Sequence, residues 1–337
     1  MTLRGGPSAA RPAAPGPERW LACDGPVVPL SGSGRLRWRG SRGPRRRTMT
    51  VTWLDARGPV DLGSFRDAVE RAERRARPGT RVEHALWTTG ARLDDAWCRF
   101  LAARDFLVGL SADGTAAGRL LPETARRLRL HGVDCNVLYR VHAGNADAPV
   151  DVYRYCRDEL GVRHVQFIPV VERAGENRRA AGRGRAGGSA VSARTVRPEQ
   201  WAAFLVAVFD EWVRRDVGRQ HVQVFEEALT AWTAAARRPR ASRAGWERLP
   251  LYCRCCPVLF ACGGGRPGHR FVESPDGESG LDYLCAGYRE FFDHIDQPMQ
   301  VMAALLRSGR DIAEVMAVIA RYEHERQAAS DARRPSS

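Results

Sequence analysis

The chain has 337 residues, of which 44% are hydrophobic, enough for one large or two smaller domains with a real core. Its net charge of +14 is confined to three Gly-, Ala- and Pro-rich segments, residues 1–47, 171–190 and 237–248, and the charges of the remainder nearly cancel. These segments lack helical or strand periodicity and interleaved aromatic side chains, so they indicate solvated flexible chain rather than a nucleic-acid-binding surface.

The sequence also gives no reason to expect a membrane protein or a secreted protein. The sequence has no run of 18 apolar residues and no apolar signal-peptide stretch near residue 1. Its nine cysteines are odd in number and clustered, which argues against a secreted disulfide framework and favours a reducing cytoplasm. Residues 1–47 are expected to be disordered, and an out-of-frame or mis-started N-terminus would have the same composition.

Strand-type and helix-type segments alternate from residue 49 onward. Apolar runs predict strands at 49–53, 82–90, 106–114, 134–142 and 164–171. Amphipathic segments predict helices at 64–77, 93–105, 123–132 and 150–160. Strands that are apolar on both faces and separated by helices predict an α/β fold with a parallel sheet, in which ligands bind at the carboxyl ends of the strands.

The second half of the chain is predicted to be mostly helical. Residues 197–218 form an amphipathic pattern that begins near Pro198 and ends at Gly218. A strand and a helix are expected in 219–236, and helices with core-packing Met and Phe residues in 286–327.

Cysteines are concentrated in LPLYCRCCPVLFACGGGRPGHRF, residues 249–271. The spacing Cys253-x2-Cys256-x5-Cys262 brings three thiolates near one point, and Cys285 can supply a fourth. Four thiolates suit Zn²⁺ or an iron–sulfur cluster, and the spacing alone does not separate the two. A set of reduced, buried cysteines without metal is the remaining alternative.

The other five cysteines are not expected to be ligands. Cys255 lies between two candidate ligands, and its side chain is expected to point away from them. Cys98, Cys135 and Cys156 are predicted to be core or helix-face thiols, and Cys23 stands in the Arg-rich N-terminal segment.

These residues resemble the SPASM domain of radical S-adenosylmethionine enzymes, and most closely the anaerobic sulfatase-maturing enzymes. The resemblance extends, with gaps, over roughly residues 48–325, and includes VEHALWTTGARLDDAWCRFLAARDFLVGLSADG, HGVDCNVLYRVHAGNADAPVDVYRYCRDELGVRHVQFIPVVE and CPVLFAC…HRF…LDYLCAGYREFFDHI. It implies a partial parallel (β/α) radical-SAM-type barrel followed by helices and a small Cys-rich SPASM-like domain. It also implies oxidation of a sulfatase Cys or Ser to formylglycine, with S-adenosylmethionine, a radical cluster and two auxiliary 4Fe–4S clusters.

The sequence departs from that family at decisive positions. The family's C-x3-C-x2-C motif for the radical cluster, expected before the second strand, is absent, because residues 1–48 contain only Cys23. The Gly-Gly-Glu-Pro turn that contacts S-adenosylmethionine is replaced in TWLDARGP, residues 52–59. Arg266 stands where the family has the last Cys of its run, and an upstream segment between Trp232 and Leu249 is missing, so the first auxiliary site is expected to be lost.

The resemblance also assigns the site. Cys253, Cys256, Cys262 and Cys285 match the ligands of the second auxiliary 4Fe–4S cluster, and Ser111 matches a position that contacts S-adenosylmethionine. The alternative interpretation of Ser111 is a strand-end turn residue, and no catalytic residue is assigned. We expect one auxiliary-type cluster, no activity of the chain as written, and a sulfatase polypeptide as the family's partner.

The expected organisation follows from these assignments. A disordered segment (1–47) precedes a partial barrel (48–175), a linker (176–196), connecting helices with a basic linker (197–248), a truncated SPASM-like segment (249–290) and C-terminal helices (291–328). Two alternatives stay open: an active maturase whose radical-cluster motif lies upstream or in another frame, and a non-catalytic four-Cys module that binds Zn²⁺ or an iron–sulfur cluster.

Overall fold

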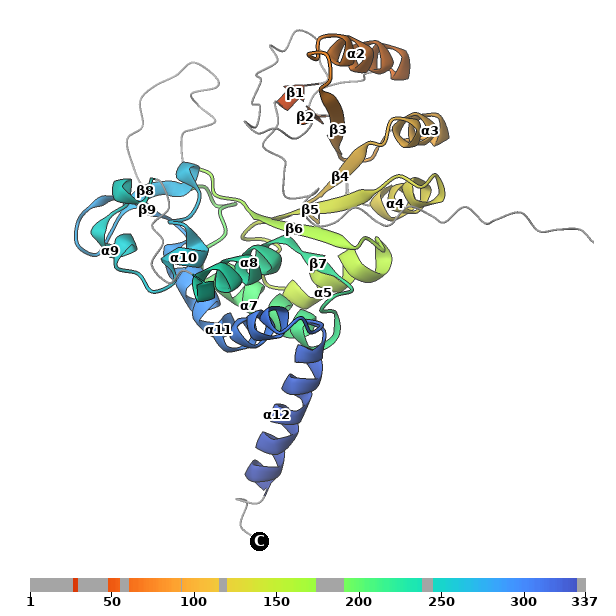
Figure 1. The fold of residues 1–337 in the computed structure, drawn as a ribbon. Helices are drawn as coiled ribbons and strands as arrows, with labels where there is room; N and C mark the ends of the chain where they lie inside the picture. The colour runs from red at the N-terminus through yellow and green to blue at the C-terminus, as the bar shows by residue number, and fades with distance from the viewer. Residues whose placement is uncertain are drawn as a thin grey trace, which may run out of the picture. The chain divides into compact units, whose positions relative to one another are not determined.

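The computed structural model describes residues 27–29, 48–54, 61–91, 93–114, 120–173, 191–237 and 245–331. The chain divides into two compact units (Figure 1). The first comprises the described residues up to Thr88 with Asp94–Val108 and Leu128–Asp134, and the second comprises the rest. The strand β4 (Leu107–Ala112) and the helix α4 (Leu121–Leu130) contribute residues to both units.

Three parallel strands form the sheet of the first unit. β2 (Thr48–Leu54) pairs with β3 (Arg81–Thr88) on one side and with β1 (Val27–Pro29) on the other. β2 and β3 coincide with the predicted strands at 49–53 and 82–90. β1 was not predicted, and the remainder of segment 1–47 lies outside the described residues.

The two helices of this unit begin at capping aspartates. Asp61 accepts a hydrogen bond from the Ser64 amide at the start of α2 (Leu62–Arg74), and Asp94 accepts one from Trp97 at the start of α3 (Asp95–Ala103). A carboxylate at this position satisfies an amide of the first turn and suits the helix dipole. Both helices were predicted from their apolar periodicity.

Aromatic rings fill the core of the first unit around Phe65, which is fully buried. Its ring centroid lies 5.2 Å from that of Trp53, 5.0 Å from that of Trp97 and 5.8 Å from that of Phe106. Edge-to-face and tilted contacts at these distances stabilise the core beyond the burial of apolar area.

The second unit contains three further parallel strands. β6 (His164–Pro169) lies between β5 (Cys135–Val141) and β7 (His221–Val222). The helix predicted over 150–160 is present, but only its first part, α5 (Pro149–Arg154), is α-helical. Residues Tyr155–Glu159 form a π-helix, η2, a distinction that apolar periodicity cannot make.

Long helices make up most of the remaining second unit: α7 (Pro198–Arg215), α8 (Gln223–Arg237), α11 (Cys285–Arg307) and α12 (Glu314–Asp331). α11 packs on both α7 and α8. Phe209, Phe225 and Phe291 meet among these three helices, with ring centroids 5.2 to 6.4 Å apart. Met299 and Met302 are fully buried, which confirms their predicted core role.

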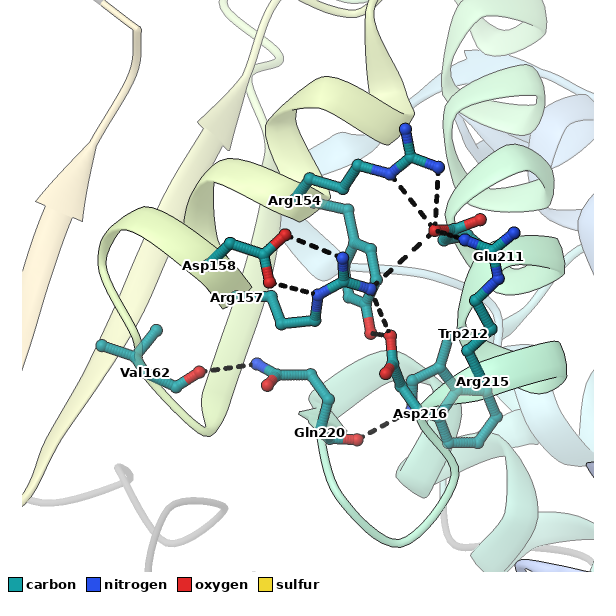
Figure 2. A network of polar contacts seen from close by, with 10 residues as sticks. Arg154, Arg157, Asp158, Val162, Glu211, Trp212, Arg215, Asp216 and Gln220 are labelled. Carbon is teal, nitrogen blue, oxygen red and sulfur yellow. Dashed lines mark hydrogen bonds and ion pairs between the residues drawn. The ribbon is translucent and has the colours of Figure 1, made fainter.

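A buried carboxylate links α5 and η2 to α7 (Figure 2). Asp216 accepts hydrogen bonds from the Tyr153 hydroxyl and from Arg157, both at 2.8 Å. Glu211, 11% exposed, is contacted by Arg154, Arg157 and Arg215. Acids and guanidinium groups alternate through the network, so the buried charges are paired and the network holds the helices together.

Short elements fill the Cys-rich region. Two single-turn α-helices, α9 (Leu251–Arg254) and α10 (Leu259–Cys262), are followed by an antiparallel hairpin of β8 (Arg270–Glu273) and β9 (Ser279–Asp282). The 3₁₀ turns Trp246–Arg248 and Pro267–His269 precede α9 and β8 respectively. Their lengths leave no periodic pattern, so the sequence predicted only a tight loop here.

The observed architecture confirms the predicted α/β class. Parallel strands and helices follow one another in each unit, as the alternation of apolar segments indicated. Among the described residues, no helix combines the length and apolarity needed to cross a membrane.

Candidate metal centre

The four candidate ligands lie on or next to three helices of the second unit, α9, α10 and α11. Cys253 lies on α9, Cys256 follows that helix, Cys262 ends α10 and Cys285 begins α11. All four are free thiols; Cys253 is buried and the other three are half-buried. They therefore share one region of the fold although 32 positions separate the first from the last.

A small hydrophobic cluster brings these elements together. It consists of Leu249, Leu259 and Leu281 with Cys253, and both Cys256 and Cys285 pack against it. Because leucines from the segments on either side of the cysteines meet here, burial of apolar area holds the thiol-bearing turns in place.

The thiols also influence one another electrostatically. Burial, together with the nearby Cys253, Cys262 and Cys256, raises the pKa of Cys285 to about 12. Burial likewise raises the pKa of Cys262 to about 11. Several thiolates can coexist in such a place only when a cation compensates them, as a metal site does.

The donor set fits a tetrahedral thiolate site by its chemistry. Four free sulfur donors are the ligand set of structural Zn²⁺ and of 4Fe–4S clusters. In the part of the chain that the structure describes, however, no three His, Cys, Asp or Glu side chains form a group that could hold a metal ion. Metal binding at these four cysteines therefore stays a prediction.

The loop after Cys262 consists of Gly263, Gly264 and Gly265, all with positive φ. Arg270 donates hydrogen bonds from its guanidinium group to the carbonyl oxygens of all three, at 2.8 to 3.2 Å. Three successive glycines thus form a tight loop directly after Cys262, held by one guanidinium group.

Two further contacts tie α9 to its surroundings. The Tyr252 hydroxyl, next to Cys253, is hydrogen-bonded by Arg289, which lies one turn after Cys285 on α11. The amide of Leu251 donates to Glu278, in the hairpin turn, at 2.6 Å. The segments that carry the first and last candidate ligands are thus joined by side chains outside the cysteine pattern.

A cavity of about 200 Å³ lies beside Cys262. Aromatic walls come from Phe167, Trp201 and Phe292. The polar residues that line it are Gln166, Gln223, Glu227, Arg266 and Tyr288. Arg266, which stands where the resembling family has a cysteine, is exposed and faces this cavity rather than adding a thiol to the group.

Ser111, the one strand residue assigned as a ligand contact, lies on another element than the cysteines. It is half-buried near the carboxyl end of β4. Gln166 lines the cavity, but Asn136 lies at the amino end of β5, opposite to the end where ligands bind in parallel sheets. Contact of Ser111 with S-adenosylmethionine stays a prediction.

Two of the remaining cysteines occupy the predicted core environment, whereas Cys135 lies on the strand β5 and neither in the core nor on a helix. Cys98 and Cys156 are fully buried in the core and Cys135 is half-buried, whereas Cys255 is exposed. Cys23 lies outside the described residues. Cys255 is exposed, whereas Cys253 is buried and Cys256 is half-buried, which agrees with the exclusion of Cys255 from the ligand set.

Sequence reasoning missed the polar residues around the thiols. Arg270, Tyr252, Arg289 and Asp282 all contact the thiol-bearing segments. The only signal was indirect: basic and acidic residues close to a cysteine cluster in an otherwise hydrophobic segment.

Comparison with known proteins gives consistent similarities. No protein-family model matches the chain. A serine-type anaerobic sulfatase-maturating enzyme of Bacteroides thetaiotaomicron is 28% identical, over 76% of this chain and 77% of that protein. One of Klebsiella aerogenes is 25% identical, over 71% and 70%, and the uncharacterized protein YidF of Escherichia coli is 30% identical, over 51% and 84%.

Comparison with solved structures also finds an anaerobic sulfatase-maturating enzyme. The solved structure described as native anSMEcpe with bound AdoMet and Cp18Cys peptide matches with a TM-score of 0.58 and 18% identity, over 76% of this chain and 86% of that one. At that identity the likeness establishes the fold alone, whereas the curated relatives add the family. The chain therefore belongs to the radical S-adenosylmethionine family of anaerobic sulfatase-maturating enzymes.

Proposed function

We propose that this chain is a maturase-family protein that binds one auxiliary-type 4Fe–4S cluster and does not itself cleave S-adenosylmethionine. Cys253, Cys256, Cys262 and Cys285 would be the ligands. The observation that carries the proposal is the packing of three of these free thiols, Cys253, Cys256 and Cys285, in or against one small hydrophobic cluster. Cys262 lies on the same short helix as Leu259 of that cluster, and Cys255 is exposed to solvent.

The cysteine inventory argues against radical chemistry by this chain. Reductive cleavage of S-adenosylmethionine in the family needs an iron–sulfur cluster with one open iron, held by three closely spaced thiolates. Before Cys98 the chain has a single cysteine, Cys23. The ligands for such a cluster are therefore missing from the sequence.

The bound cluster would supply electron transfer or structural stability. With four protein thiolates no iron is left open to a substrate, so this site alone would not bind S-adenosylmethionine. The chain's own residues would exclude water through Leu249, Leu259 and Leu281 and hold the thiols at fixed separations.

The relatives suggest what to test as ligand and partner. The similar solved structure contains AdoMet and a Cys-containing peptide by its description. For this chain we propose weak binding of S-adenosylmethionine, with Ser111 as the one contact residue assigned, and a sulfatase polypeptide as the partner. Equilibrium dialysis with S-adenosylmethionine tests the first point, and saturation at micromolar concentration would contradict it.

The decisive experiment is metal analysis of chain purified and reconstituted without oxygen. We expect about four irons and four sulfides per chain. Cys256→Ser should reduce the iron to less than about one per chain, because it removes a ligand. Cys255→Ser, its exposed neighbour, is the matched control and should keep the full amount.

Each other result selects a different hypothesis. Equal iron loss in both variants would contradict the ligand assignment. About eight irons would indicate a second cluster and support an active maturase. About one zinc without sulfide would favour the four-Cys binding module, and absence of metal would favour reduced structural cysteines.

A further inference from the structure

A single buried carboxylate connects the segments that carry two of the proposed ligands. Asp282, 2% exposed, lies at the end of β9. Its Oδ2 accepts a hydrogen bond from the Arg266 amide at 2.8 Å, and its Oδ1 accepts one from the Leu284 amide at 2.7 Å. Arg266 closes the loop after Cys262, and Leu284 immediately precedes Cys285.

Arg270 holds the same loop from the neighbouring strand. It is paired with Asp282 across the β8–β9 hairpin. Its Nε donates to the Gly264 carbonyl at 2.8 Å, and its Nη2 donates to the carbonyls of Gly265 and Gly263 at 2.9 and 3.2 Å. The guanidinium therefore fixes the carbonyl side of the loop while the carboxylate fixes its amide side.

The approach of loop and carboxylate is close enough to require glycine. A Cβ atom on Gly265 would lie 2.1 Å from the Asp282 Oδ2. The His269 side chain also lies near this carboxylate, with its Nδ1 4.0 Å from Oδ2. The glycine loop after Cys262 and the β8–β9 hairpin are thus packed against each other around the buried Asp282 carboxylate.

We infer that Asp282 and Arg270 form a clamp that positions Cys262 relative to Cys285 and places a negative charge beside the metal centre. This inference rests on the proposed four-thiolate cluster. Side chains outside the ligand set commonly fix ligand orientation and tune the metal, and a nearby carboxylate stabilises the more oxidised state of an iron–sulfur cluster. Neither residue contacts the reacting atoms, so both are positioning residues.

The test compares three variants of the full chain after anaerobic reconstitution. Asp282→Ala removes both hydrogen bonds, and retained iron after desalting should fall at least about threefold. Asp282→Asn keeps the shape and removes the charge, so it should retain more iron while the midpoint potential of the cluster becomes more positive. Asp276→Asn, the same change at an exposed position in the same hairpin, should match the wild type in both.

Hydrogen exchange gives a readout that does not depend on metal or on activity. The Arg266 and Leu284 amides should exchange faster in Asp282→Ala than in the wild type, with the far-UV circular dichroism unchanged. Wild-type iron retention in Asp282→Ala together with an unshifted potential in Asp282→Asn would overturn the clamp. A wild-type chain that holds no iron and sulfide would instead overturn the proposed function, on which the clamp depends.

Discussion

At the scale of single residues, three glycines decide how the chain folds after Cys262. Their φ values are +62° at Gly263, +80° at Gly264 and +72° at Gly265. Residues with a Cβ rarely adopt this left-handed region, so the loop is accessible to glycine at little cost. The sequence Gly-Gly-Gly therefore encodes the turn that presents its carbonyl groups to Arg270.

Gly265→Ala tests the close contact at the end of this loop. The new methyl group would collide with Asp282, and the positive φ adds roughly 1–2 kcal/mol of strain. We expect the free energy of unfolding to fall by about 2 kcal/mol or more, with loss of bound iron. Urea unfolding and iron analysis measure both effects.

Gly268→Ala is the matched control for that substitution. A Cβ atom at Gly268 meets no atom within 4 Å, and its φ is not in the positive range. Stability should therefore change by less than about 0.5 kcal/mol. Equal losses in the two variants would show that the segment is generally sensitive to alanine and would contradict the steric explanation.

A buried histidine has its tautomer fixed in the first unit. The Trp53 indole donates to His84 Nδ1 at 3.1 Å, so Nδ1 accepts and Nε2 carries the proton toward Glu73, 3.3 Å away. Glu73 also accepts a hydrogen bond from Arg104 at 2.6 Å. Burial lowers the pKa of His84, and its ionic neighbours do not reverse that shift.

At the scale of elements, α7 and α11 approach each other closely at a glycine. Gly287 is buried in the first turn of α11, and a Cβ there would lie 2.2 Å from the Pro198 carbonyl oxygen, at the start of α7. Cys285 begins the same helix, so the packing of α11 on α7 also fixes where the last candidate ligand emerges.

Gly287→Ala should therefore be destabilising although alanine is the better helix former. In an exposed helix the change would stabilise by about 1 kcal/mol, whereas here the helices must separate, and we expect a loss of about 2 kcal/mol or more. Urea unfolding measures it, with Ala304→Gly on the exposed face of α11 as control, which should cost about 1 kcal/mol. A gain in stability for Gly287→Ala would contradict the close approach.

Elements with a long periodic pattern could be predicted from the sequence, and shorter ones could not. The apolar repeat of 197–218 predicted α7, and the apolar run of 134–142 predicted β5. The four-residue helices α9 and α10 and the strands β8 and β9 are too short for a period, and they form because Leu249, Leu259 and Leu281 are buried together. β1, of three residues, was missed for the same reason.

The candidate ligands could be proposed from spacing, but their supporting residues could not. Cys253, Cys256 and Cys262 lie within ten positions, which is visible in the sequence. Asp282 meets the Arg266 amide only because the hairpin folds back across 16 positions. Contacts of this kind depend on the tertiary structure, and no local pattern announces them.

At the scale of the whole molecule, fold and cysteine inventory support different parts of the proposal. The likeness to a solved maturase structure covers 76% of this chain, so the α/β architecture of the family is retained over most of its length. The cysteines that could bind metal are concentrated between residues 253 and 285. The fold therefore supports membership of the family, whereas the loss of one step of its chemistry stays part of the proposal.

Both compact units contain a buried histidine that is held neutral, and acid should therefore destabilise both. Burial lowers the pKa of His84 in the first unit and lowers that of His164 in the second to about 4, where the adjacent His221 adds to the shift. The unfolded chain binds these protons near pH 6.5 and the folded chain only at lower pH, so stability is full above pH 6.5 and falls as the pH decreases below it.

Urea unfolding at pH 7.5, 6.5 and 5.5, followed by circular dichroism, should show a free energy of unfolding that decreases with the pH. His84→Gln and His164→Gln should each reduce that dependence, because each removes one buried ring that is held neutral. A free energy that stays constant or rises toward pH 5.5 would show that neither histidine is held neutral by the fold.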